Sequence, residues 1–528
     1  MLSQSIQCFP KAVRWTAALS MAMTTLVAGG FAQTAAEPAN GFKAEETLLG
    51  PFHWYTPMAG MTEGLITVSA DGRHVAYFDR GAGCQPAGSK VCIFVDGRPN
   101  PVEEKTDVES LAISADGKHV AYLASQGKRS WLVVDWQARP ECEGCADANL
   151  LFSPALLFSP DGKRVAFSAG NGDRKHFASW AVVDGVAGAH YDQVTNLIFS
   201  PDSSRVAYAA RTDKTWAAVV DGVPGPPCDA VWGPVFSPDS KRVVYVARHD
   251  KEWSVVVDGQ AGVAYAALPT DAVIGDHPIG SADLIPAIWS KMDGQLDGAY
   301  DQLGTNTFGP IGNQYVFPVA FSADSKHFAY VAWTRGGWVV VEDGKEGPGA
   351  MKIGVGSPAI GPNGEVAYSA KTCCSMKEGP WKIVADGRES TDGYDKLFNP
   401  SLSPDGKRVA FAAERAELGK MQDWVFVVDG QIGARGVAIG NWTFSADSKH
   451  VAYVVQPHQG MSLDYPWGGG TWVVFLDGKA GAEYSVVLPD SLRFGSDGAL
   501  EFLAVKKEGH SIEENHGSLY RVRYIPTP

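Results

Sequence analysis

Residues 197–231, with the sequence LIFSPDSSRVAYAARTDKTWAAVVDGVPGPPCDAV, contain the pattern that decides the fold. Two apolar runs, LIFS and RVAYAA, flank a turn at Pro201-Asp202-Ser203, and a third run, WAAVV, ends at Asp221-Gly222. Val, Ile, Tyr, Phe and Trp dominate the runs, whereas Asp-Gly or Asp-Ser marks the turns, a combination typical of β-hairpins. The stretch therefore predicts four short antiparallel strands.

The first of these turns recurs ten times along the chain, usually at intervals of 37 to 50 residues. One such sheet cannot bury its own faces, so a period of this size predicts an array of stacked sheets. Four strands per repeat match the blade of a β-propeller. We therefore expect an all-β protein of about ten or eleven four-stranded blades, the eleventh being a degraded copy within the one double interval. The ten turns lie around Asp71, Asp116, Asp161, Asp202, Asp239, Asp324, Asn363, Asp405, Asp447 and Asp497.

Two runs in each repeat resemble those of a known family. SPDGKRVAF at 159–167 and WSVVVDG at 253–259 are similar to the WD40-like (PD40) repeat of the TolB type, found in bacterial periplasmic propellers. The resemblance covers about residues 60–528. It implies the fold but no set of functional residues, because propellers of this kind have many functions.

The number of blades leaves two arrangements open. Propeller rings usually have four to eight blades, and residues 265–316 interrupt the period. We favour two propellers that meet near residue 316, formed by residues 63–316 with the irregular insertion 265–316 and by residues 317–528. One large ring is the alternative.

The last repeat provides three strands and then the chain stops. Residues 33–62 precede the first repeat, and within them the run PFHWYTPMAGM at 51–61 stands where a fourth strand is missing. We expect this run to complete the last blade and to cover its exposed edge.

The N-terminal residues predict export. Lys11 and Arg14 precede an apolar stretch at 15–31, and small residues follow, so residues 1–32 have the pattern of a signal peptide. We therefore expect a periplasmic or secreted protein with no transmembrane span after cleavage. The net charge of −14 argues against binding to nucleic acid, because an acidic surface repels phosphate.

Seven of the eight cysteines lie beyond residue 32, where an oxidising compartment would permit disulfides. Cys84 and Cys92 are candidates for a disulfide across a hairpin, and Cys142 and Cys145 for a local clamp. The odd number leaves one thiol free.

The loops between the second and third strands vary most in length, and variable loops often contain binding residues. The longest, 454–471, contains His458, Asp464, Tyr465 and Trp467 among glycines, and a second loop contains Arg174 and His176. Such side chains suit a peptide or a sugar ring. The alternative is a solvated loop without a ligand.

Two repeated side chains are better explained by packing. A tryptophan precedes the Asp-Gly turn in eight repeats, and repetition at one position predicts contacts between blades. The basic residue after each first turn is expected to face the turn Asp or solvent. The tryptophans are Trp131, Trp180, Trp216, Trp253, Trp338, Trp381, Trp424 and Trp472.

The sequence offers little support for an enzyme. It has no G-x-S-x-G, P-loop, HExxH or EF-hand pattern. Glu63 and Glu109 are the only catalytic candidates, as an acid and base pair at a tunnel mouth. We therefore favour a non-enzymatic exported propeller, with no cofactor and no metal, that presents its variable-loop face to an exported or envelope protein or peptide. A propeller hydrolase acting on a carbohydrate or small polar substrate is the alternative.

Overall fold

Residues 36–528 form one compact unit in the computed structural model. The residues that the structure describes contain strands and turns and no helix, so none of them forms a helix able to cross a membrane. They are residues 41–53, 66–79, 92–102, 106–127, 129–142, 156–172, 177–250, 252–266, 272–274, 277–279, 319–334, 337–354, 358–371, 380–398, 400–414, 424–457, 471–488, 490–507 and 516–527.

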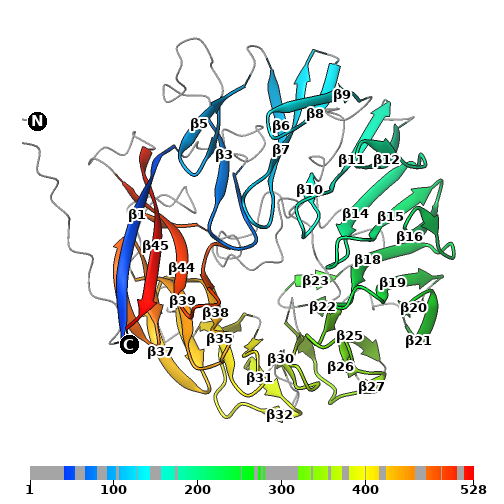
Figure 1. Ribbon diagram of the computed structural model, residues 1–528. Coiled ribbons are helices and arrows are strands. Elements are labelled where there is room, and N and C mark those ends of the chain that lie inside the picture. Colours follow the sequence, from blue (N-terminus) through cyan, green and yellow to red (C-terminus); the bar gives the residue numbers. More distant parts are fainter. Residues whose placement is uncertain are drawn as a thin grey trace, which may run out of the picture. The chain divides into compact units, whose positions relative to one another are not determined.

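The first five blades are four-stranded antiparallel sheets in which each strand pairs with the next along the chain (Figure 1). Blade 1 has β2 (Ile66–Val68), β3 (Val75–Asp79), β4 (Cys92–Val95) and β5 (Arg98–Pro101), and blade 2 has β6 (Asp107–Ile113), β7 (Val120–Gln126), β8 (Arg129–Val134) and β9 (Gln137–Glu141). Blade 3 has β10 (Leu157–Phe158), β11 (Val165–Gly172), β12 (Phe177–Val183) and β13 (Val186–Ala187), and blade 4 has β14 (Gln193–Phe199), β15 (Val206–Thr212), β16 (Thr215–Val220) and β17 (Val223–Pro224). Blade 5 has β18 (Ala230–Phe236), β19 (Val243–His249), β20 (Glu252–Val257) and β21 (Gln260–Ala266), and a separate hairpin of β22 (Ala272–Ile274) and β23 (His277–Ile279) follows it.

The other five blades follow the same plan, although in blades 7, 8 and 10 the first strand is divided into two short pieces that pair with the same neighbour. Blade 6 has β24 (Ala320–Phe321), β25 (Phe328–Thr334), β26 (Gly337–Glu342) and β27 (Lys345–Glu346), and blade 7 has β28 (Lys352–Ile353), β29 (Ala359–Ile360), β30 (Val366–Lys371), β31 (Lys382–Ala385) and β32 (Arg388–Glu389). Blade 8 has β33 (Lys396–Leu397), β34 (Ser401–Leu402), β35 (Val409–Glu414), β36 (Trp424–Val428) and β37 (Gln431–Gly436), and blade 9 has β38 (Ala438–Phe444), β39 (Val451–Gln456), β40 (Trp472–Leu476) and β41 (Lys479–Tyr484). Blade 10 has β42 (Val486–Val487), β43 (Arg493–Phe494), β44 (Leu500–Lys507), β45 (His516–Pro526) and β1 (Phe42–His53).

The Asp-Gly turns join the third and fourth strands of most blades by a common geometry. In the turn of blade 4, Asp221 has φ 51° and Gly222 has φ 79°, so both central residues are left-handed, as in a type I′ turn. This turn matches the right-handed twist of its strands, and Asp and Gly are among the residues that tolerate it best. The expected β-hairpins are thus confirmed, and the Asp-Gly turn of blade 4 has the geometry of a type I′ turn.

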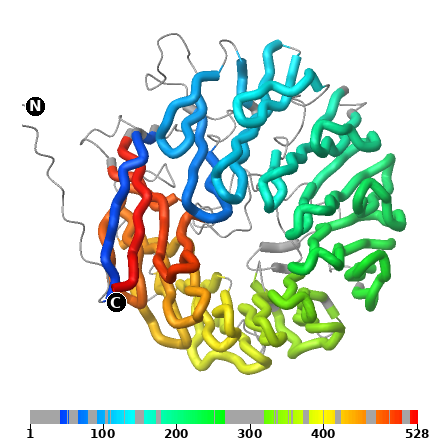
Figure 2. The backbone as a smooth tube through the Cα atoms, viewed as in Figure 1, coloured from blue at the N-terminus to red at the C-terminus, as the bar shows by residue number. Residues whose placement is uncertain are grey.

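The hydrophobic core consists of ten separate clusters, and each lies between two consecutive blades. Tyr77 and Phe94 of blade 1 share a cluster with Leu503 of blade 10. Likewise, Val244 of blade 5 and Val339 of blade 6 belong to one cluster. Ten blades joined by ten such interfaces form one closed propeller (Figure 2). The favoured division into two propellers near residue 316 is therefore wrong, and the alternative of one large ring is correct.

The N-terminal strand closes the ring, as expected, but it comes from an earlier part of the chain. β1 pairs with β45 from Phe42–Pro526 to His53–His516, with one irregularity between Leu48 and Gly50. The expected run 51–61 shares only residues 51–53 with this strand, and residues 54–61 lie outside the described part. The strand begins earlier because its charged and apolar residues alternate: the partly buried Phe42 and Ala44 pack on blade 10, whereas Lys43 and Glu45 are exposed.

The repeated tryptophans pack between blades, as predicted. Trp180, Trp338, Trp424 and Trp472 are each at most 7% exposed and belong to clusters that join neighbouring blades. Repetition at one position therefore reflects burial and not a row of ligand sites.

Candidate functional site

Most of the predicted binding residues lie outside the described part of the chain. This applies to His458, Asp464, Tyr465, Trp467, Arg174, His176 and to the catalytic candidate Glu63. Glu109 lies in β6, where the register shifts between Val108 and Ser110, but its side chain is not described. The expected acid and base pair therefore falls outside what the structure describes, and these assignments stay predictions.

The cysteines are described only in part. Cys84 and Cys145 lie outside the described residues, so the pairings of Cys84 with Cys92 and of Cys142 with Cys145 stay predictions. Cys228 is a free thiol in the core between blades 4 and 5. Its burial raises the pKa of the thiol to about 11, which makes it a poor nucleophile.

A repeated arrangement of charged side chains lies at the turns that join the first and second strands and the third and fourth strands. In blade 3, Asp184 of the Asp-Gly turn accepts a hydrogen bond from the Val165 N–H at 3.0 Å and one from Arg164 Nε at 2.8 Å. In blade 1, His74 takes the place of the arginine, and its Nδ1 lies 2.7 Å from Asp96 Oδ2. The predicted role of the basic residue is thus confirmed. Equivalent pairs are Arg205–Asp221, Arg408–Asp429, His119–Asp135, His327–Asp343 and His450–Asp477.

In eight of the ten blades, a serine at the start of the first turn donates a hydrogen bond to the turn Asp; blades 7 and 10 have Gly361 and Gly495 at this position. Ser159 Oγ donates to Asp161 at 2.6 Å and accepts from the Arg164 N–H at 3.0 Å. Hydrogen bonds from the Ser159 hydroxyl and the Lys163 N–H hold the pKa of Asp161 at about 2. This carboxylate is therefore committed to its own hairpin and unsuited to act as a general base near neutral pH.

Where the basic residue is arginine, it also binds the next blade. Arg164 Nη1 donates to the carbonyl oxygens of Ser203 and Ser204 in blade 4, both at 3.0 Å, and its guanidinium lies 5.2 Å from the ring centre of Phe199. Ser203 Oγ in turn accepts from the Asp161 N–H of blade 3 at 2.9 Å. The same set of contacts joins blades 8 and 9, through Arg408, Ser448 and Phe444.

Where the basic residue is histidine, the facing residue of the next blade is glycine. A Cβ on Gly117 of blade 2 would lie 2.1 Å from the His74 ring, and a Cβ on Gly364 of blade 7 would lie 3.3 Å from the His327 ring. The imidazole thus fills the space that a side chain would need. Both glycines have positive φ, at 69° and 89°.

Where the turn has a basic residue, the two kinds of interface follow one rule, to which blades 7 and 10, with Glu365 and Ala499 at this position, do not belong. Each arginine faces a serine in the left-handed conformation, and three of the four histidines face a glycine, whereas His450 packs against Phe42 and Phe494. The serine is an unusual choice at φ 61–67°, but its hydroxyl accepts the backbone N–H of the preceding blade, which offsets the strain. The arginine pairs are Arg164 with Ser203, Arg205 with Ser240, Arg242 with Ser325 and Arg408 with Ser448; the histidine pairs are His74 with Gly117, His119 with Gly162 and His327 with Gly364.

This rule is not visible within a single repeat. The signal lies in the comparison of the last residue of one turn with the third residue of the next turn, which is about 40 positions later in most pairs and 83 positions later for Arg242 and Ser325. Only pairs of adjacent blades reveal it.

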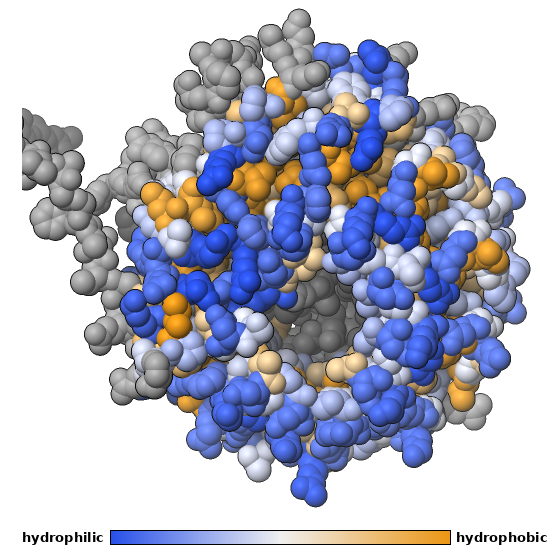
Figure 3. All heavy atoms as spheres, viewed as in Figure 1, coloured by the Kyte–Doolittle hydropathy of each residue, from blue (hydrophilic) through white to orange (hydrophobic). Residues whose placement is uncertain are grey.

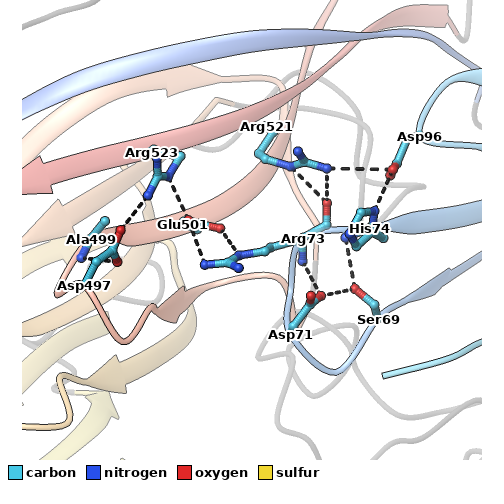
Figure 4. A network of polar contacts seen from close by, with 10 residues as sticks. All are labelled: Ser69, Asp71, Arg73, His74, Asp96, Asp497, Ala499, Glu501, Arg521 and Arg523. Carbon is cyan, nitrogen blue, oxygen red and sulfur yellow. Dashed lines mark hydrogen bonds and ion pairs between the residues drawn. The ribbon is translucent and has the colours of Figure 1, made fainter. Parts of the chain in front are cut away.

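Blades 10 and 1 meet through a different network, because the turn of blade 10 has no basic residue at the usual position (Figure 4). Glu501 is only 4% exposed and accepts from Arg73 Nε at 2.6 Å and from Arg523 Nε at 2.7 Å. Arg521 donates to the Arg73 carbonyl oxygen from Nε at 3.0 Å and from Nη2 at 2.6 Å. These groups bind the two ends of the chain together at the closing interface.

Blade 6 differs from the other histidine blades because it has an additional carboxylate beside the His–Asp pair. Glu342 occupies the position before the turn Asp, where six other blades have valine. One ligand atom from each of His327, Glu342 and Asp343 lies within 4.8 Å of the others. Burial and the neighbouring Asp343 raise the pKa of Glu342.

Comparison with known proteins finds distant similarity to solved structures. No family model and no curated protein matches this chain. Among solved structures, it is similar to the β-propeller domain of the trilobed protease from Pyrococcus furiosus, at 13% identity and a TM-score of 0.26, over 63% of this chain and 95% of that domain. TolB from Acinetobacter baumannii matches at 12% identity and a TM-score of 0.24, over 61% of this chain and 80% of TolB.

A third similar structure is the dihydro-heme d1 dehydrogenase NirN in complex with DHE, at 14% identity and a TM-score of 0.33, over 79% of this chain and 80% of NirN. Likenesses at this level carry no functional information. The strand pairings and the blade interfaces establish that the chain is a ten-bladed β-propeller.

Proposed function

We propose that this protein is a binding or scaffold propeller that presents one arc of its loop face to a protein or peptide partner. The repeats are of the TolB type in this proposal, and residues 1–32 direct the chain to the periplasm or outside the cell. The single observation that carries the proposal is the unequal distribution of long loops around the ring.

On the face with the Asp-Gly turns, the charged side chains stabilise the blades and their interfaces. Its carboxylates accept backbone N–H groups of their own blade, and its basic residues pair with those carboxylates or bind the next blade. Hydrophilic side chains cover much of the surface in the view of Figure 3. A partner that recognised this turn face would have to compete with hydrogen bonds that already stabilise the ring.

The opposite ends of the blades have loops between the second and third strands, and their lengths differ by blade. In blades 2, 4, 5 and 6 only two residues separate these strands, for example 213–214 in blade 4. In blades 7, 8, 9, 10 and 1 the linking residues are 372–381, 415–423, 457–471, 508–515 and 80–91.

These five blades are consecutive once blade 10 closes on blade 1. The long loops therefore belong to one continuous arc, and the short turns belong mainly to the other. Burial of the core gives no reason for this asymmetry, since in both arcs each blade packs on its neighbours through a hydrophobic cluster. Extra loop length concentrated on one side of a rigid scaffold is typical of a binding surface.

The test replaces residues 457–471 by Asp-Lys, the two residues that form the short turn at 213–214 of blade 4. The tagged protein is crosslinked in cells and its partners are identified by mass spectrometry. We expect one or two exported proteins to be captured by the native chain and lost from the variant. A matched control changes the short turn Asp213-Lys214 to Asn-Gly and should capture the same partners as the native chain.

Two outcomes would refute the proposal. One is capture of the same partners by the native chain and the loop variant, which would place recognition elsewhere. The other is the absence of any enriched partner from the native chain. Melting curves of both variants should resemble the native curve, because the exchanged residues lie between the second and third strands of their blades.

A further inference from the structure

We propose that His327, Glu342 and Asp343 form a binding site for one divalent transition-metal ion, with Zn²⁺ as the expected ion. This proposal does not depend on the proposed partner-binding function. It concerns the turn face of blade 6, at the border with blade 7.

The donor set suits zinc. Imidazole nitrogen and carboxylate oxygen are common Zn²⁺ ligands, at about 2.0–2.2 Å. His327 Nδ1 lies 2.6 Å from Asp343 Oδ2, and the Glu342 carboxylate completes a set of ligand atoms within 4.8 Å of one another. In a tetrahedral site, ligand atoms are about 3.3 Å apart, so small side-chain rotations would accommodate the ion. A fourth position would stay open to water.

The backbone provides space for this cluster. Gly364 of blade 7 lies above it, and a Cβ there would be 3.0 Å from Glu342 Oε1 and 3.3 Å from the His327 ring. A glycine at φ 89° thus leaves room for both ligands.

The charge around Glu342 is unfavourable without a cation. Asp343 and Asp386 place like charges near the Glu342 carboxylate, and among the described residues no hydrogen bond to this carboxylate is found. His327 and Lys345 oppose these charges, and Lys326 is paired with Asp324 at 2.8 Å. A bound cation would compensate two adjacent carboxylates directly.

The other histidine blades provide internal controls. His119 and Asp135 of blade 2 lie in the same arrangement at 2.7 Å, but Val134 replaces the glutamate. Two donors alone do not make a zinc site of ordinary affinity. The His–Asp pair of blade 6 is therefore a general feature of the histidine blades, whereas Glu342 is particular to blade 6.

The experiment measures Zn²⁺ binding to the full chain without residues 1–32, stripped with EDTA and titrated calorimetrically. We expect one more equivalent of tight binding in the native protein than in Glu342→Val, and at least tenfold weaker binding at this site in Glu342→Gln. Glu342→Val introduces the residue that six other blades have at this position, so it should fold normally, which circular dichroism checks.

A gain-of-site variant makes the test independent of any loss of stability. Val134→Glu builds the same three donors in blade 2 and should add one equivalent of Zn²⁺. Equal stoichiometry and affinity in the native chain, Glu342→Val and Glu342→Gln would overturn the proposal, and so would a native chain that takes up no Zn²⁺ at micromolar concentration.

Discussion

The match between arginine and serine across blade interfaces predicts a measurable coupling between residues of different blades. The perturbation is the conversion of the interface between blades 3 and 4 to the histidine type, by Arg164→His and Ser203→Gly, singly and together. The interface between blades 1 and 2, with His74 and Gly117, is the natural model for the double variant.

The expected magnitude follows from the contacts. Arg164→His removes two hydrogen bonds to carbonyl oxygens and a cation–π contact, in a side chain that is 31% exposed. These amount to about 2 kcal/mol together. The imidazole also meets the Cβ of Ser203, since a Cβ at the equivalent Gly117 would lie 2.1 Å from His74.

Ser203→Gly alone has two opposed effects. It removes the hydroxyl that accepts the Asp161 N–H, which costs about 1 kcal/mol, and it relieves a non-glycine residue at φ 67°, which returns about the same. We therefore expect little net change from this variant. The double variant should be more stable than the sum of the single effects by about 1 kcal/mol, because the glycine makes room for the imidazole.

The assay is equilibrium unfolding in urea for all four proteins, with the coupling energy taken from the double-mutant cycle. Arg164→His combined with Ser448→Gly is the matched control, since Ser448 faces Arg408 and not Arg164. That pair should be additive within about 0.4 kcal/mol. A coupling energy near zero for the adjacent pair, or an equal coupling for the distant pair, would refute the reasoning.

Three further predictions concern the closing interface and its histidine. Glu501→Ala should lower the free energy of unfolding by about 2–3 kcal/mol, because two charge-assisted hydrogen bonds to a buried carboxylate are lost. Glu141→Ala, which breaks an exposed ion pair, is the control and should change the free energy of unfolding by less than about 0.5 kcal/mol. Urea unfolding compares the two variants, and equal losses would contradict the prediction. Deletion of residues 41–53 exposes the edge of β45 and should lower the calorimetric melting temperature of the whole unit, so an unchanged temperature would show that β1 does not close the ring. The hydrogen bond to Asp96 raises the pKa of His74, so the stabilisation by the protonated imidazole is complete below about pH 6.5 and is lost as the pH rises through the raised pKa. Melting curves of His74→Asn between about pH 5.5 and 8 should lack this part of the pH dependence. A variant with the same pH dependence as the native protein would argue against this role of His74.

The sequence determined the blade and its closure. Alternation of apolar residues, Asp-Gly turns and the repeated tryptophan all act within one repeat or between neighbours, so they could be recognised locally. The need for a strand from the N-terminus also followed from counting strands in the last repeat. Its position did not, because the edge of β45 selects Phe42–His53 by burial of alternate residues, which only the pairing reveals.

The candidate sites divide in the same way. Glu63, Glu109 and the loop residues are candidates by chemical type alone, and all of them except Glu109 lie outside the described residues. A lone glutamate in a strand has no distinctive sequence signal, so the sequence does not distinguish Glu342 and Glu501. Their significance comes from residues far away in the chain: Gly364 for Glu342, and Arg73 for Glu501.

Only the tertiary structure decided that the ten blades form one ring. Each blade contacts its two neighbours, and the number of blades depends on a small rotation between them that a single repeat does not encode. The same closure makes blades 7 to 10 and blade 1 consecutive, so that long loops from both ends of the sequence belong to one arc. The sequence thus determines each interface, whereas the sum of ten interface rotations determines the ring and the arc to which the long loops belong.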